Sequence, residues 1–271
     1  MKRGWLAAAP LVAALSLSGC VAGEFGYSYR ESVEETRPLA SNGTFRLDNT
    51  NGRVTVATWD EPRVRIEAEK AAGSRHALRD LEVVVTGEGD RVTVETRYPR
   101  RHWLGGSGKV DYHVSLPREA RISVRSVNGR VEIDGVLGSV KASTVNGSVE
   151  LTHVGGEVAA STVNGSVTAS LTRLDPSARS EIETTNGAVR LTLPRDAGAE
   201  IEARTVNGRI HCDFELAEGG RSSRHRLEGR IGSGGARIEL RTVNGSVRVD
   251  RGLATADARR SAEEEPGRDH R

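Results

Sequence analysis

Apolar and polar residues alternate through the middle of the chain, and Asn-Gly pairs interrupt this alternation at a constant interval. The pairs Asn128-Gly129, Asn146-Gly147 and Asn164-Gly165 are evenly spaced, and Gly138 and Gly156 stand halfway between them. A fixed period of this length is typical of repeat architectures, in which each unit packs only against its neighbours.

Between the turns the alternation has a period of two, which is the period of a β-strand with one buried face. Asn-Gly also signals hairpins, so an antiparallel meander competes with a parallel β-solenoid. Identical turns at a constant interval, with a different turn at Gly155-Gly156 halfway, favour the solenoid. We therefore predict an all-β, single-domain parallel β-solenoid with two short strands in each coil of about 18 residues.

The repeated phrase Thr-x-Asn-Gly allows two roles for its side chains. Stacked Asn and Thr side chains would hydrogen-bond from coil to coil, or each Asn would serve only its own turn, because Asn and Gly tolerate positive φ. The pattern leaves both open. The predicted turn residues are Asn51, Gly52, Asn128, Gly129, Asn146, Gly147, Asn164, Gly165, Asn186, Gly187, Asn207, Gly208, Asn244 and Gly245.

The solenoid domain is expected over residues 40–250, with regular coils over 122–250. Its later turns, at Asn186, Asn207 and Asn244, are less evenly spaced. The last interval is close to two coils and contains the polar stretch Glu218–Leu227, which predicts an excursion loop. Residues 40–121 are β-rich but irregular, with a short helix expected within 71–81. We expect this part to cap the open strand edges at one end.

Residues 1–19 predict a lipoprotein signal peptide. Lys2 and Arg3 precede an apolar stretch, Trp5–Leu17, that is too short to span a membrane as a helix. Leu17-Ser18-Gly19-Cys20 then matches the bacterial lipobox, so we expect cleavage before Cys20 and acylation of its sulfur. Two or three acyl chains make a durable anchor.

The segments that flank the solenoid are expected to be irregular. Residues 20–39 would form a lipidated tether, although the alternation of Phe25, Tyr27 and Tyr29 also allows a first edge strand. Residues 251–271 lose all periodicity and predict a disordered tail.

The net charge gives no support for a nucleic-acid partner, and the cysteine content leaves a single free thiol. The formal charge of +2 disappears once Lys2 and Arg3 leave with the signal peptide, so bulk charge gives no argument for a nucleic-acid partner. With Cys20 acylated, Cys212 stands alone, and its place two positions after Ile210 predicts a buried strand thiol.

The sequence shows no convincing motif for catalysis, metal binding or cofactor binding, so no catalytic residue, metal site or cofactor is predicted. The seven histidines show no metal-ligand spacing. Residues 105–109 resemble a phosphate loop but precede a strand pattern rather than the required helix. The regular coils carry Glu132, Asp134, Glu150 and Glu157 without an obvious cluster, whereas a glycan-active β-helix enzyme needs converging carboxylates.

One loop is a candidate binding segment. Arg100, Arg101, His102, Trp103 and Lys109 gather cations around a tryptophan. Such a set suits anionic glycans or lipid headgroups. The alternative is a solvated loop with Trp103 packed against the solenoid.

The repeated Thr-Val-Asn-Gly-Ser-Val resembles the bacterial "putative adhesin" family over about residues 40–250. Supporting pieces are residues 51–60, 114–117, 191–194 and 232–235. The resemblance implies a cell-envelope domain of unknown function built on a β-solenoid, with no established catalytic residues.

Signal and resemblance together lead to two functional hypotheses. The first is a lipid-anchored, non-enzymatic, adhesin-like module of the bacterial envelope that binds a glycan, surface or envelope protein partner. The second is a periplasmic envelope-stress or scaffold lipoprotein with a membrane or protein partner. The residue after Cys20 is Val21 rather than Asp, which by resemblance to sorting in diderm bacteria permits outer-membrane delivery.

Overall fold

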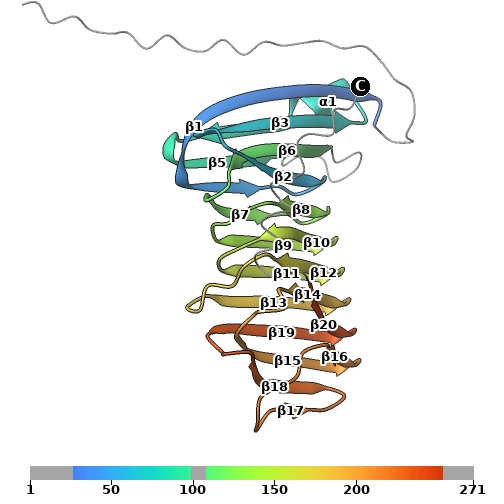
Figure 1. Ribbon diagram of the computed structural model, residues 1–271. Coiled ribbons are helices and arrows are strands. Elements are labelled where there is room, and N and C mark those ends of the chain that lie inside the picture. The colour runs from blue at the N-terminus through green and yellow to red at the C-terminus, as the bar shows by residue number, and fades with distance from the viewer. Residues whose placement is uncertain (1–26, 99–107, 253–271) are drawn as a thin grey trace, which may run out of the picture.

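The computed structural model describes residues 27–98 and 108–252 and shows a stack of short β-coils (Figure 1). The prediction of an all-β parallel solenoid is confirmed. In each regular coil one strand joins sheet A and the next joins sheet B, and the two sheets face each other. In this part of the chain one helix occurs, α1 (Arg75–Arg79), within the range predicted for it.

The regular coils stack in chain order and in register. Sheet B contains β7 (Arg121–Arg125), β9 (Val140–Asn146), β11 (Val158–Asn164) and β13 (Arg179–Asn186). Sheet A contains β8 (Val131–Asp134), β10 (Val149–Val154), β12 (Val167–Leu171) and β14 (Val189–Leu193). Val131, Val149 and Val167 lie side by side on neighbouring strands, as the constant spacing of the turns requires.

A thin aliphatic core fills the space between the sheets. The inward side chains at the strand positions of Val131, Ile133 and Val140 are valine, isoleucine, leucine or alanine in most coils, and they are almost completely buried. Larger side chains such as Phe45 and Tyr112 are buried at the N-terminal end. Burial of apolar surface is the main stabilising contribution, and each coil supplies part of it only because the next coil covers its edge.

The last coils do not stack in chain order. They are β15 (Ala199–Asn207) with β16 (Ile210–Cys212) and β19 (Ala236–Asn244) with β20 (Val247–Arg251). Strand β19 pairs in parallel with both β13 and β15, so the final coil lies between two earlier coils (Figure 1). Strand β20 likewise lies between β14 and β16.

The loop predicted at 218–227 is wrong in part. The chain instead forms β17 (Arg221–Ser222) and β18 (Arg226–Ile231), and β18 pairs antiparallel with β15. Leu227 and Ile231 are buried. The chain folds back here because the edge of β15 would otherwise leave backbone groups unpaired, and two apolar side chains cover the end of the core.

The first coil is also inserted between others. Its strands are the second half of β1 (Tyr29–Asp48) and β2 (Val54–Trp59). They lie between the coil of β7 and β8 and the coil of β5 (Gly89–Arg97) and β6 (Lys109–Pro117). Both terminal coils of the described chain are therefore held on two sides.

The first half of β1 corrects the predicted tether. From Tyr29 to Pro38 it pairs antiparallel with β3 (Arg63–Ala72), which agrees with the alternative of a first edge strand rather than with a tether. Strand β3 pairs with β6, and β4 (Glu82–Thr86) pairs with β5 in the hairpin at the other sheet. Together with α1 these strands cover the N-terminal end (Figure 1).

Candidate interaction surface

The Asn side chains of the turns form one continuous hydrogen-bonded ladder along the solenoid. In every link the Nδ2 group donates to the Oδ1 of the next Asn toward the N-terminal end, over 2.7–2.9 Å. The order of the ladder is Asn207, Asn244, Asn186, Asn164, Asn146, Asn128 and Asn51. It follows the spatial order of the coils, so Asn244 stands between Asn186 and Asn207.

Threonine and glycine complete each turn beside the ladder. Thr162 donates from its buried hydroxyl to the carbonyl oxygen of Gly147 on the neighbouring coil, at 2.9 Å, and four other threonines do the same. The turns approach so closely that a Cβ on Gly147 would lie 2.1 Å from the carbonyl oxygen of Gly129. The glycine is therefore required by the distance between coils.

This rigid corner presents a line of exposed valines on the outer face of sheet B. Each valine directly precedes the asparagine of a turn and follows a threonine, or Ser126 in the case of Val127, and it points outward. The valine row consists of Val127, Val145, Val163, Val243 and Val206, with exposed fractions from 39% to 64%. Thr185 takes the same position on β13.

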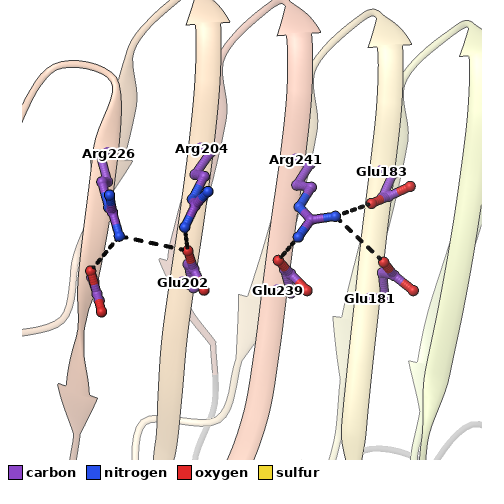
Figure 2. Close-up of polar contacts among 8 residues, drawn as sticks. Glu181, Glu183, Glu202, Arg204, Arg226, Glu239 and Arg241 are labelled. Atoms are coloured by element: carbon purple, nitrogen blue, oxygen red, sulfur yellow. Dashed lines mark hydrogen bonds and ion pairs between the residues drawn. The ribbon is translucent and has the colours of Figure 1, made fainter.

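Charged side chains form two further rows on the same face, toward the C-terminal end. The glutamate row consists of Glu181, Glu239, Glu202 and Glu228, which are register partners on β13, β19, β15 and β18. The arginine row consists of Arg241, Arg204 and Arg226 on the last three of these strands. Figure 2 shows the two rows side by side, with Glu183 continuing the arginine row on β13.

Ion pairs connect the two rows. Arg241 contacts Glu239 and also reaches Glu183, with Nη1 at 3.3 Å from Oε1, and Glu181 at 4.0 Å. Arg204 contacts Glu202, and Arg226 lies 2.9 Å from Glu228. Every arginine of the row thus pairs with the glutamate two positions away on its own strand. Along the row Arg204 has arginine on both sides, whereas Arg241 has Arg204 on one side and Glu183 on the other.

Glu183 lies in an environment that shifts the pKa of its carboxyl group. Partial burial, followed by the charge of Glu181 and a hydrogen bond with it, raises the pKa of Glu183 above its ordinary value, although Arg241 acts in the opposite direction. The carboxylate form of Glu183 is therefore less favourable here than in water.

Two open grooves flank the charged rows. One, of about 720 Å³, lies between the valine row and the arginine row and includes Glu183 and His225 in its lining. The other, of about 700 Å³, lies on the far side of the glutamate row and includes Arg230, Arg237 and the 218–221 turn.

The residues predicted to bind or react lie elsewhere or outside the described residues. Cys20 and Arg100–Trp103 are outside them. Lys109 begins β6, and its ammonium lies 3.0 Å from the carboxylate of Asp111. Cys212 is half-buried rather than fully buried, because β16 is at an edge of sheet A, and burial still raises the pKa of its thiol.

Glu132 and Glu150, two of the carboxylates singled out in the regular coils, are register partners on sheet A and share Arg130 as an ion-pair partner. Glu132 pairs with Arg130 at 3.1 Å, and the Nδ1 of His153 lies 2.9 Å from the carboxylate of Asp134. His153 has a φ of 50°, which is unusual for a residue other than glycine. Glu157 belongs to the turn before β11.

Sequence reasoning missed the charged rows because their members come from four strands that are out of chain order. The local signal was present as Glu-x-Arg in residues 202–204 and 239–241, and as Arg-x-Glu in 226–228. Only the insertion of β19 and the reversal of β18 bring these three pairs into line.

Within residues 27–98 and 108–252, no group of three or more His, Cys, Asp or Glu side chains is arranged to hold a metal ion. The helix in this part of the chain is also too short to cross a membrane.

Residues 106–250, more than half of the chain, match the family described as Toastrack DUF4097. The chain therefore belongs to the Toastrack DUF4097 family. A comparison with curated proteins finds no match.

Similar solved structures include two bacterial proteins. A "putative cell adhesion protein" from Clostridium sporogenes is 12% identical, covers 82% of this chain and all of its own, and has a TM-score of 0.47. A "putative adhesin" from Bacteroides fragilis is 11% identical, covers 81% of this chain and 97% of its own, and has a TM-score of 0.33.

Proposed function

We propose that this protein is a lipid-anchored, non-catalytic binding or scaffolding module of the bacterial cell envelope. The observation that carries the proposal is the outer face of sheet B. It combines a row of exposed valines with ordered rows of glutamate and arginine, on a backbone that the Asn ladder holds rigid. Rigid faces of this kind bind extended partners with little loss of conformational entropy.

The anchor rests on residues 17–20, whose pattern matches the lipobox. Acylation of Cys20 would hold the N-terminal, capped end of the solenoid near the membrane, because β1 begins at Tyr29. The remaining coils would then extend away from the bilayer.

Metabolic labelling with a palmitate analogue tests the anchor. The wild-type chain should incorporate the label, and Cys20→Ser should lose it, while Cys212→Ser should retain it as the matched control. Equal labelling of wild type and Cys20→Ser would contradict the anchor.

Protease shaving of intact cells tests on which side of the envelope the module acts. An antibody against the segment beyond Gly252 reports cleavage, and a known periplasmic protein is the control. Loss of the signal with the control intact supports adhesion to an external partner. Survival of the signal until the envelope is breached favours the periplasmic scaffold or envelope-stress role.

One observation favours a glycan-active enzyme as a second candidate. Glu181 and Glu183 are neighbouring carboxylates of which one has a raised pKa, a pattern shared with acid-base pairs. Arg241, however, forms ion pairs with both carboxylates, at 4.0 Å from Glu181 and 3.3 Å from Glu183. Release of reducing sugars from an envelope glycan by wild type, and its loss in Glu183→Gln, would support the enzyme over the binding module.

A further inference from the structure

We propose that the charged rows of sheet B are a self-complementary surface on which a second copy of this chain docks, with the two solenoids parallel. This inference goes beyond the proposed function and does not depend on it. It follows from the order of the charges on β15, β18 and β19.

The alignment of like charges is unfavourable within one molecule. Glu202 stands directly opposite Glu228, and Arg204 directly opposite Arg226, on the antiparallel strands β15 and β18. Like charges in such positions destabilise a sheet. Reversing the order of the charges on β18 would have placed opposite charges directly opposite each other. In the order that the sequence has, the attraction between the two strands is the diagonal contact of Arg226 with Glu202, at 4.0 Å.

The glutamate and arginine rows continue from β15 onto β18 even though the two strands run in opposite directions. Strand β18 runs antiparallel to β15, and its sequence reads Arg226-x-Glu228 where β15 reads Glu202-x-Arg204. The side chains on both strands consequently extend the same two rows (Figure 2). The half-exposed carboxylates and guanidinium groups stand on the outer face, accessible to a partner.

Two parallel rows of opposite charge fit a second copy in one orientation. A two-fold axis between the rows and parallel to them places Glu239, Glu202 and Glu228 on the partner's arginine row, whereas on β13 Glu181 comes over the partner's Glu183. An axis across the rows would instead place each row on itself, with glutamate facing glutamate. Closed two-fold interfaces use the same patch on both copies, and electrostatic complementarity fixes their register.

The favoured axis runs along the solenoid, so both N-terminal ends point the same way. Strand β19 then faces its own copy, and Glu239 lies over the partner's Arg241. The position of Arg237 comes over that of Val243, where the aliphatic stem of the arginine can cover the exposed valine. The complementary contact extends over three strands spaced by about 4.8 Å and is smaller than a standard interface, so the dimer is weak in dilute solution.

Variants with exchanged charges on β15 and β18 test the proposed dimer. Self-association of the full chain in detergent is measured by sedimentation velocity. The pair Arg204→Glu with Arg226→Glu should weaken self-association at least about tenfold, because glutamate then faces glutamate. The pair Glu202→Arg with Glu228→Arg should do the same. Mixing these two variants should restore association, which a folding defect in either one would not allow.

A fourfold variant tests the orientation. Glu202→Arg, Arg204→Glu, Arg226→Glu and Glu228→Arg together exchange the rows on both strands, while the ion pairs within each strand and the net charge are preserved. This variant should associate with itself as wild type does, and about tenfold less with wild type. Preferential mixing with wild type would mean that each row lies on itself, and would overturn the parallel arrangement.

The salt dependence of self-association provides a further test of the proposed dimer. Wild-type association should be lost at about 1 M salt, where the Debye length is about 3 Å. A wild-type chain that stays monomeric at low salt and high concentration, or one whose association is unchanged by salt and by the charge pairs, would overturn the proposal.

Discussion

A single glycine in each turn sets how closely the coils can approach. At Gly147 the carbonyl oxygen of the neighbouring Gly129 occupies the place of a side chain, and the same contact recurs along the ladder. Any Cβ there must push two coils apart, and the displacement would also stretch the Asn and Thr hydrogen bonds on either side.

Gly147→Ala should therefore lower the free energy of unfolding by at least about 2 kcal/mol, as overpacking of a close contact does. Gly89→Ala is the matched control, because Gly89 has a φ of 71° but a Cβ added there would meet nothing within 4 Å. The Gly89→Ala variant should lose only about 1 kcal/mol of unfolding free energy, which is the cost of a left-handed backbone for alanine. Urea unfolding of both variants gives the comparison; an equal loss would contradict the steric role.

The amides of the ladder act as donor and acceptor at once. Asn164 donates to Asn146 and accepts from Asn186, each at 2.9 Å. Asn164→Ala should cost about 1 kcal/mol of unfolding free energy, because water can satisfy part of what the exposed neighbours lose. Asn42, which also precedes a glycine but lies outside the ladder, is the control. Its replacement by Ala should change the stability by less than about 0.5 kcal/mol.

Glu183 gives the protein a pH dependence with a definite sign. Its folded pKa is raised, so its contribution to stability is present below its unfolded pKa of about 4.3 and is lost as the pH rises through the folded value. Glu183→Gln stays neutral and avoids this loss. The variant should melt close to wild type near pH 4 and higher than wild type at pH 7.5.

Calorimetry at the two pH values decides this prediction. Glu150→Gln, on the outer face of sheet A, is the control for the replacement of a surface glutamate by glutamine. A melting temperature for Glu183→Gln below that of wild type at pH 7.5 would mean that the ion pair of Glu183 with Arg241 outweighs the effects of burial and of Glu181.

At the scale of elements, the position of β19 and β20 is the main departure from a simple repeat. The last coil in the chain has neighbours on both sides. The carbonyl oxygen of Ser246 accepts from the amide of Val189 on one side, and the amide of Val247 donates to the carbonyl oxygen of Arg209 on the other. In a solenoid stacked in chain order the last coil would be an open end and would fray.

Hydrogen exchange should show the difference. Amides of β19 and β20 should be as protected as those of β13 and β14, whereas β16 and β17 at the end of the stack should exchange faster. Exchange is read by mass spectrometry of peptides from each strand. Faster exchange in β20 than in β16 would show that the last coil is peripheral.

At the scale of the whole molecule, insertion of both terminal coils connects the two ends of the chain to the interior of the stack. Strands β1 and β2 lie between other coils at one end, as β19 and β20 do at the other. Neither terminal coil can leave the stack without breaking contacts with two neighbouring coils.

We therefore expect one cooperative unfolding transition rather than loss of coils from the end. Cys212 lies on β16, near the C-terminal end of the stack. In a Cys20→Ser background, labelling of the Cys212 thiol should have the same denaturant midpoint as circular dichroism at the β-sheet band. Labelling of Cys212 well before the loss of β-structure would show independent unfolding of that end. Coincident probes are the standard evidence for a two-state transition.

The local pattern of the sequence determined the repeat, the turn residues and the inward positions. The reason is that each depends on a short range: a strand alternates every two positions, and a turn needs a glycine where the backbone comes close. The seven Asn-Gly pairs predicted as turns all lie in the ladder region, and Val131, Val149 and Val167 stack as their spacing indicated. The choice between a ladder and isolated turns needed the distances between side chains.

Only the tertiary structure decided which coil lies beside which. Residues 205–208 and 242–245 read the same Thr-Val-Asn-Gly, so either turn fits equally well against Gly187, and the local sequence contains nothing that prefers one of them. The choice depends on the closure of the exposed edges by β18 and the burial of Leu227 and Ile231. That same choice aligned the glutamate and arginine rows, because charges on separate strands become neighbours only when the strands are placed.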